Sequence, residues 1–175
     1  MSTPLVFTFV GADQPGLVET LAQTVSAHGG NWLESRMSEL AGQFPGIVKV
    51  EVAHEQATAL RAALLALSAR QLSVLVAGQH TDESTGSYRR LRLSILGNDR
   101  PGIVREVAHA LAARQISVCE MNTSVTSAPM SGEPLFEAVA HIQVPQALDL
   151  AELNTQLDRI AEALTVDIDL EESLR

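Results

Sequence analysis

Basic side chains and aromatic residues are scarce in this sequence, and each scarcity narrows what the chain can do. Lys49 is the single lysine, and the formal net charge is −9. Proteins that bind nucleic-acid phosphates on their own carry a basic patch, so direct nucleic-acid binding is not expected. With 3% aromatic residues the core must consist mainly of Leu, Val, Ile and Ala, although 46% hydrophobic residues suffice for a folded domain.

Cysteines and long apolar runs are almost absent as well. Cys119 is the only cysteine, which excludes an intrachain disulfide and favours a reducing compartment. It lies in ISVCEMN, a predicted strand, where we expect a small buried apolar side chain. No apolar run reaches the roughly 18 residues of a membrane span, and the N-terminus lacks the basic start of a signal peptide. We therefore expect a cytoplasmic protein with no membrane partner.

No constellation of catalytic residues is present in the sequence. The five histidines are scattered and form neither an HxxxH nor an HExxH pair. GxSxG, Walker-type and GxGxxG motifs are missing. The C-terminal segment DIDLEESLR is typical of a solvated stretch rather than of a metal site. The sequence predicts no enzymatic activity, no catalytic residue, no metal and no cofactor.

The chain contains an internal repeat with an offset of 86 residues. Residues 5–22 align with residues 91–108 with seven identities in eighteen positions. Two copies of one unit explain this match. The segment between them, GQHTDESTGSYRR, is polar and rich in Ser, Thr and Gly, which is typical of a linker. We expect domains at residues 1–84 and 85–175, with the linker at about 79–88.

Each copy is predicted to contain the elements β-α-β-β-α-β. In the first copy we expect strands at 5–10, 31–40, 47–54 and 72–78, helices at 15–30 and 57–70, and a turn at 41–46. In the second we expect strands at 91–97, 117–127, 135–144 and 165–170, and helices at 101–115 and 148–164. This order predicts an α+β fold of two tandem ferredoxin-like units, each an antiparallel sheet with two helices on one face. The uncovered edges and faces need either the other copy or a second chain.

The repeated strand-to-helix turn follows the pattern GxDxPG. We expect the carboxylates of Asp13 and Asp99 to cap the helices, and Gly11 and Gly97 to allow a tight exit from the strands through backbone angles closed to other residues. Free amides at a helix start also favour a bound carboxylate. From the residues alone, the turn is either a cap that binds nothing or a site for a small zwitterion.

The segments GADQPGLV and GNDRPGIV, each opening a β-α-β-β-α-β unit, resemble the signature of ACT domains over nearly the whole chain. The resemblance implies small regulatory modules that bind amino acids at this turn and at the start of the next strand, usually where two modules meet. GGNW at 29–32 resembles the family's G-x-N-I. The matching residues of the first copy are Asp13, Gln14, Pro15, Gly16, Leu17 and Asn31. Those of the second copy are Asn98, Asp99, Arg100, Gly102 and Ile103, with Ser117 in place of the asparagine, which argues against a second site.

Two ACT units without a catalytic domain are most similar to the glycine cleavage system transcriptional repressors. This resemblance implies a glycine-responsive regulator that contacts a DNA-binding transcription factor, in agreement with the acidic charge. A non-sensing dimerisation or interaction module of the same fold is the alternative, and the detached regulatory part of a biosynthetic enzyme is a third. Asn31 close to Asp13 would favour sensing, because the pair could hold both charged ends of an amino acid. The sequence leaves open whether the copies pair within one chain or in a homodimer.

Overall fold

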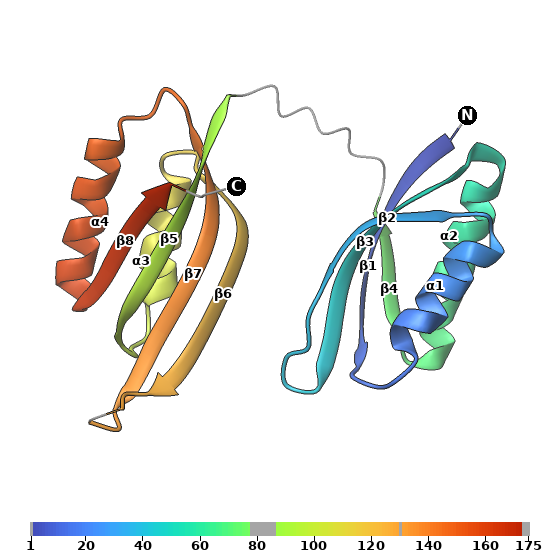
Figure 1. Cartoon of the computed structure of the whole chain (residues 1–175), viewed down its shortest axis with the longest axis horizontal. Coiled ribbons are helices and arrows are strands. Elements are labelled where there is room, and N and C mark those ends of the chain that lie inside the picture. The colour runs from blue at the N-terminus through green and yellow to red at the C-terminus, as the bar shows by residue number, and fades with distance from the viewer. Residues whose placement is uncertain (1, 78–86, 130, 173–175) are drawn as a thin grey trace. The chain divides into compact units, whose positions relative to one another are not determined.

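The computed structural model describes residues 2–77, 87–129 and 131–172, and the chain divides into two units, Met1–Glu83 and Ser84–Arg175 (Figure 1). The predicted boundary at residue 84 and most of the predicted linker lie outside the described residues. The domain limits of the sequence analysis therefore stay a prediction. Within the described ranges, no helix is long and apolar enough to span a membrane.

The described part of unit 1 contains the six elements expected from the sequence. They are β1 (Ser2–Ala12), α1 (Leu17–Ala27), β2 (Asn31–Met37), β3 (Gln43–Ala53), α2 (Ala57–Ala66) and β4 (Ser73–Ala77), with short 3-10 turns at His54–Gln56 and Leu67–Arg70. Gly29 adopts a φ of 67° just after α1, and the amide of Gly30 donates to the carbonyl of Val25 at 2.9 Å. The glycine pair therefore ends this helix.

Unit 2 repeats the order of elements. They are β5 (Tyr88–Asn98), α3 (Ile103–Ala112), β6 (Ser117–Ser127), β7 (Pro134–Pro145), α4 (Leu150–Leu164) and β8 (Val166–Glu172). α4 has a side-chain cap, because the carboxylate of Asp149 accepts a hydrogen bond from the amide of Ala151 at 2.8 Å.

The two sheets have the same topology. Their strand orders are β2-β3-β1-β4 and β6-β7-β5-β8, and all neighbours are antiparallel. The equivalent edge strands β2 and β6 carry an irregularity at the same place, between Trp32 and Glu34 in β2 and between Val118 and Glu120 in β6. In each unit the helices lie on one side of the sheet (Figure 1). The α+β fold of two ferredoxin-like units is confirmed.

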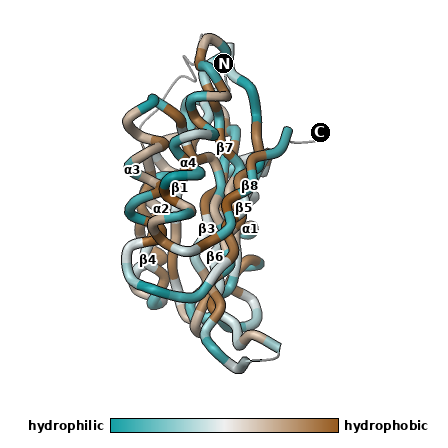
Figure 2. Tube along the Cα trace, turned by 90° about the vertical axis from the view of Figure 1, so that its left-hand side faces the viewer, coloured by the Kyte–Doolittle hydropathy of each residue, from teal (hydrophilic) through white to brown (hydrophobic). Residues whose placement is uncertain are grey.

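Each unit has a hydrophobic core of its own between sheet and helices. Alternate residues of the central strands point into it, as Phe7 and Phe9 do from β1 and Leu93 and Ile95 from β5. Figure 2 shows the resulting alternation of apolar and polar segments along the trace. As composition predicts, most of the core side chains in both units are aliphatic.

Three local expectations differ from the structure. The predicted turn at 41–46 is too long, because β3 begins at Gln43 and pairs along its whole length with β1. The helix expected at 57–70 is α-helical only to Ala66 and ends in a 3-10 turn. Cys119 is exposed rather than buried, because it lies at the irregularity of β6, an edge strand whose described side chains all face solvent.

Candidate functional site

The repeated turn starts both helices without a side-chain cap. Gly16 occupies the N-cap position of α1 with a φ of 87°, and Gly102 that of α3 with a φ of 104°; no side chain of the described chain caps either helix. The predicted capping by Asp13 and Asp99 is therefore wrong. Both side chains are exposed, and their backbone amides instead donate to the carbonyls of Gly42 and Pro134, each at 2.9 Å. These bonds fasten the turn to the strand beside it.

The glycines at the ends of the strands are required for space and not for unusual backbone angles. Gly11 and Gly97 are not among the described residues with positive φ, so that part of the expectation is wrong. A Cβ on Gly97 would lie 2.8 Å from the Cα of Val166 on the neighbouring strand. A Cβ on Gly11 would lie 2.9 Å from Cδ1 of Leu72, a side chain that can move.

A pocket of about 310 Å³ lies at the turn of unit 1. This volume is at the small end of the range for ligand sites. Its lining comprises Gly11, Ala12, Gln14, Pro15, Gly16, Leu17, Glu19, Thr20, Gln23, Gln71 and Leu72. Four of the predicted residues therefore line one pocket: Gln14, Pro15, Gly16 and Leu17. Asp13 is next to it in sequence but does not line it.

The pocket has one kind of group that favours a negatively charged ligand atom and another that favours a positively charged one. Among the described residues, the backbone amides of Val18 and Glu19 at the start of α1 have no hydrogen-bond acceptor. Glu19 lines the pocket, whereas Val18 does not. Such amides favour a carboxylate. The carboxylate of Glu19 lies on the same first turn and is held by Nε2 of Gln23 at 3.0 Å. No basic side chain lines the pocket, so a ligand with one negative and one positive end suits it better than a simple anion.

The sequence analysis missed the polar lining residues Glu19, Thr20, Gln23 and Gln71. The helical period contains a signal for Glu19 and Gln23, which lie four residues apart on the same face of α1 as the turn. Gln71 could have been found from the topology. β4 pairs antiparallel with β1, with Ser73 opposite Val10, so the residues just before β4 must lie beside the end of β1.

Asn31 does not lie near the turn of its own unit. It opens β2 opposite Glu51, and Glu51 lies opposite Pro4 at the start of β1, whereas the turn follows the end of β1. α1, with 11 residues and a length of about 16 Å, separates the two places. Asn31 is therefore not close to Asp13 within one unit, so the proximity that would favour sensing is not found there. A joint site would require a second module.

The turn of unit 2 has the same backbone but different surroundings. Ile103 is 2% exposed and belongs to the core, so its side chain is not available to a ligand. Arg105 stands in place of Glu19, and its guanidinium contacts the carboxylate of Glu106 at 2.6 Å. A guanidinium at this position would repel an ammonium group. Of the five predicted residues of unit 2, only Asn98 lines a described pocket.

That pocket is acidic and is lined from the end of β5, α4 and the start of β8, with no residue of α3. It has a volume of about 690 Å³ and is lined by Leu96, Gly97, Asn98, Asp158, Ala161, Glu162, Thr165, Val166, Asp167, Ile168 and Asp169. Its carboxylates do not converge on a common point: within the described ranges, no three His, Cys, Asp or Glu side chains are placed to hold a metal ion.

Comparisons with known proteins agree with this architecture. Residues 3–77 match the family model of the ACT domain, a regulatory fold that binds amino acids. A crystal structure described as an unknown protein from Galdieria sulphuraria superposes with a TM-score of 0.86 and 28% identity, over 99% of this chain and 100% of that one. A structure described as "putative glycine cleavage system transcriptional repressor" superposes with a TM-score of 0.73 and 21% identity, over 100% of this chain and 99% of that one. No curated protein matches the sequence. Unit 1 thus matches the ACT-domain model over residues 3–77, unit 2 repeats the fold of unit 1, and the chain as a whole has a tandem ACT-like architecture.

Proposed function

We propose that this protein is a regulator that binds a small amino acid at the β1–α1 turn of unit 1. The observation that carries the proposal is that the start of α1, whose amides of Val18 and Glu19 have no acceptor among the described residues, meets the pocket at Glu19, which also brings a carboxylate to it. The amides would hold the ligand's carboxylate, and Glu19 its ammonium group. Gln14, Gln71 and Thr20 would supply further hydrogen bonds. Asp13 would contribute only through its backbone amide, which fastens the turn.

Glycine is the first candidate ligand. The pocket of about 310 Å³ accommodates a small amino acid, and Gly11, Gly16, Leu17 and Leu72 are among its lining residues. The name of one neighbour of the same fold refers to glycine cleavage. Serine, which adds one hydroxyl group, is the nearest competitor.

The regulatory output would pass through a protein partner, for which a DNA-binding transcription factor is the best candidate. A net charge of −9 with a single lysine opposes direct contact with DNA phosphates. Ligand binding would stabilise one state of the protein that the partner recognises. Such a regulator would act in the cytoplasm and would not catalyse a reaction.

Unit 2 would serve a structural role in this scheme. Its turn lacks a carboxylate at the position of Glu19 and places the Arg105–Glu106 pair there instead. The sensing copy and the structural copy would then share one fold.

Thermal unfolding with a panel of amino acids, led by glycine and serine, tests the proposal. A ligand that binds only the native state raises stability by about 2.7 kcal/mol at a hundredfold excess over its Kd. We expect glycine to raise the midpoint, and Glu19→Gln to remove the shift while Glu55→Gln, on an exposed turn outside the pocket, retains it. No shift with any amino acid at millimolar concentration would favour a non-sensing interaction module. A midpoint shift that persists in Glu19→Gln would show that the protein binds the amino acid at a place other than this pocket.

A further inference from the structure

Unit 2 contains a groove between α3 and α4. The polar side chains that line it from α4 are absent at the equivalent positions of unit 1. Its volume is about 660 Å³, and it is lined by Glu106, Arg114, Glu152, Thr155, Gln156, Arg159, Ile160, Ala163 and Leu164. Arg114 follows α3 and pairs with Glu152 at the start of α4, whereas Glu106 lies near the start of α3 and Leu164 ends α4. The helices are therefore antiparallel along the groove, whose α4 wall is about 18 Å long.

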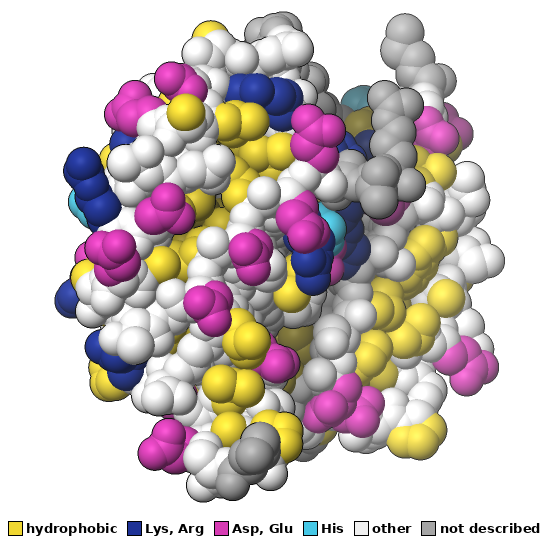
Figure 3. Space-filling model, turned by 60° about the vertical axis from the view of Figure 1, so that its left-hand side comes forward, with side chains coloured by type: hydrophobic (Ala, Val, Ile, Leu, Met, Phe, Trp, Pro, Cys, Tyr) yellow, Lys and Arg dark blue, Asp and Glu magenta, His cyan; other side chains and the backbone are white. Residues whose placement is uncertain are grey.

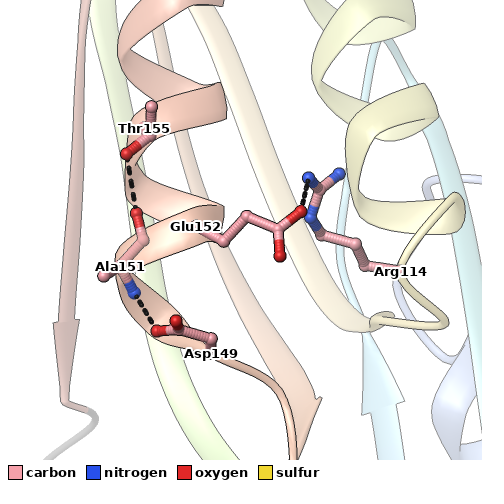
Figure 4. A network of polar contacts seen from close by, with 5 residues as sticks. All are labelled: Arg114, Asp149, Ala151, Glu152 and Thr155. Carbon is pink, nitrogen blue, oxygen red and sulfur yellow. Dashed lines mark hydrogen bonds and ion pairs between the residues drawn. The ribbon is translucent and has the colours of Figure 1, made fainter.

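The acidic groups of the groove are already neutralised. Oε1 of Glu152 accepts from Nη2 of Arg114 at 3.2 Å, as Figure 4 shows, and the Arg114 side chain is only 18% exposed. Glu106 is held by Arg105 at 2.6 Å. Arg159 takes part in none of the ion pairs formed by the described residues. The uncommitted charge in the groove is thus positive, although the chain is strongly acidic.

Gln156 is the second uncommitted group. Its Oε1 is buried and has no hydrogen-bond partner among the described residues. A buried carbonyl without a donor destabilises the fold, so the amide loses nothing when it turns toward a partner in the groove. Gln156 and Arg159 lie three residues apart on α4 and therefore face the groove side by side.

The floor beside these two polar groups is apolar. Ile160, Ala163 and Leu164 continue the same face of α4 toward its end. Figure 3 shows hydrophobic side chains bordered by charged ones on the side of the chain that comes forward in that view. An apolar surface with a few convergent polar groups is the usual composition of a small-molecule site.

The equivalent positions of unit 1 indicate that these polar residues are not demanded by the fold. The buried pairs Leu60–Leu64 and Leu153–Leu157 align α2 with α4. The polar residues Glu152, Thr155, Gln156 and Arg159 then correspond to Ala59, Ala62, Ala63 and Ala66. Four alanines satisfy the same helix packing, so the four polar side chains in unit 2 invite a separate explanation.

We propose that the α3–α4 groove of unit 2 binds a small organic acid with an apolar body and an amide-like hydrogen-bonding group. Arg159 holds the carboxylate, Gln156 pairs with the polar group, and Ile160 and Leu164 contact the apolar body. This site is distinct from the turn of unit 1 and does not depend on the function proposed for it.

N-acetylleucine is a suitable probe because it carries a carboxylate, an amide and an isobutyl group but no ammonium group. Titration of the full chain, followed by ¹⁵N–¹H NMR, should shift resonances of α3 and α4 and leave the β1–α1 turn unperturbed. Its methyl ester, which lacks the charge, should bind at least about tenfold more weakly. Arg159→Gln and Gln156→Leu should each weaken binding by about tenfold or more, whereas Arg61→Gln on α2 should leave it unchanged.

Three outcomes would overturn the inference. They are the absence of groove shifts up to about 10 mM probe, shifts confined to the unit 1 turn, and unchanged affinity of both groove variants. Because Arg159 is exposed, its substitution leaves the fold intact, which far-UV circular dichroism checks. A loss of binding in that variant therefore reports on the site and not on folding.

Discussion

Unit 1 and unit 2 build the strand-to-helix turn with the same backbone but surround it with different side chains. Gly16 and Gly102 are both N-cap residues with left-handed backbone angles. Asp13 and Asp99 each donate a backbone hydrogen bond to the strand-side carbonyl beside the turn. On the first helical turn, however, unit 1 has Glu19 where unit 2 has an arginine. The residues that the two turns share are therefore those that the backbone requires, and under the proposed function the residues that differ would set the ligand preference.

The faces of the sheets that the helices leave uncovered differ in the same way. In unit 1, Ile47 and Leu75 flank Thr8 on this face and are 44% and 69% exposed. In unit 2 the corresponding face carries an ion pair between Arg92 and Glu171, 3.5 Å apart. At these positions the uncovered face is thus apolar in unit 1 and charged in unit 2.

The largest expected effects come from truncating one core at a time. Leu60→Ala and Leu153→Ala remove fully buried leucines of units 1 and 2, and each should cost about 2–5 kcal/mol in the unit that carries it. Trp32, the only tryptophan, packs on the core of unit 1 and meets the Phe7 ring edge-on at 6.4 Å. Its fluorescence during urea unfolding should shift with Leu60→Ala and stay unchanged with Leu153→Ala, whereas circular dichroism should detect both. Equal shifts of the fluorescence transition would show that the units unfold as one.

The second prediction exchanges the chemistry of the two turns. Glu19→Arg gives unit 1 the residue of unit 2, and it should weaken amino-acid binding by about ten- to a hundredfold, because a charged hydrogen bond of about 1.5–3 kcal/mol is lost. Isothermal titration with glycine measures the change. Asp13→Ala keeps the backbone amide that fastens the turn, so it should leave binding nearly unchanged. If Asp13→Ala weakened binding more than Glu19→Arg, Asp13 rather than Glu19 would be the residue that contacts the ligand.

The third prediction compares the two strand-end glycines. Gly97→Ala forces a Cβ against the backbone of Val166, so we expect about 1–3 kcal/mol of destabilisation in unit 2. Gly11→Ala meets the ends of two side chains, Cδ1 of Leu72 at 2.9 Å and Cδ1 of Leu17 at 3.3 Å, both of which can rotate. The nearest backbone atom, the carbonyl oxygen of Gln71, is 3.6 Å away, an ordinary contact. Thermal unfolding should therefore show a smaller loss for Gly11→Ala. Equal losses of stability in the two variants would mean that the Leu72 side chain cannot rotate away from the added methyl group.

The sequence contained most of the fold but only part of the candidate site. The 86-residue repeat and the periods of the apolar residues identified the order of the elements and the sheets, because burial of one face imposes those periods. The roles at the turn were assigned less well. Asp13 and Gly16 occupy adjacent parts of one motif, and the sequence does not reveal which of them is the N-cap. Gln71 enters the pocket only through strand pairing, which a local pattern does not encode.

The smallest expected effects distinguish a real helix cap from an apparent one. Asp149 accepts the amide of Ala151, so Asp149→Ala should lower the stability of unit 2 by about 1 kcal/mol. Asp13 and Asp99 look like caps in the sequence, but their side chains are exposed and cap nothing in the described chain. Asp13→Ala and Asp99→Ala should therefore change the free energy of unfolding by no more than about 0.5 kcal/mol. Urea unfolding of the three variants measures this contrast. If Asp99→Ala lowered the free energy of unfolding as much as Asp149→Ala, the Asp99 side chain would cap α3 after all. The left-handed conformation of Gly102 would then not be what starts this helix.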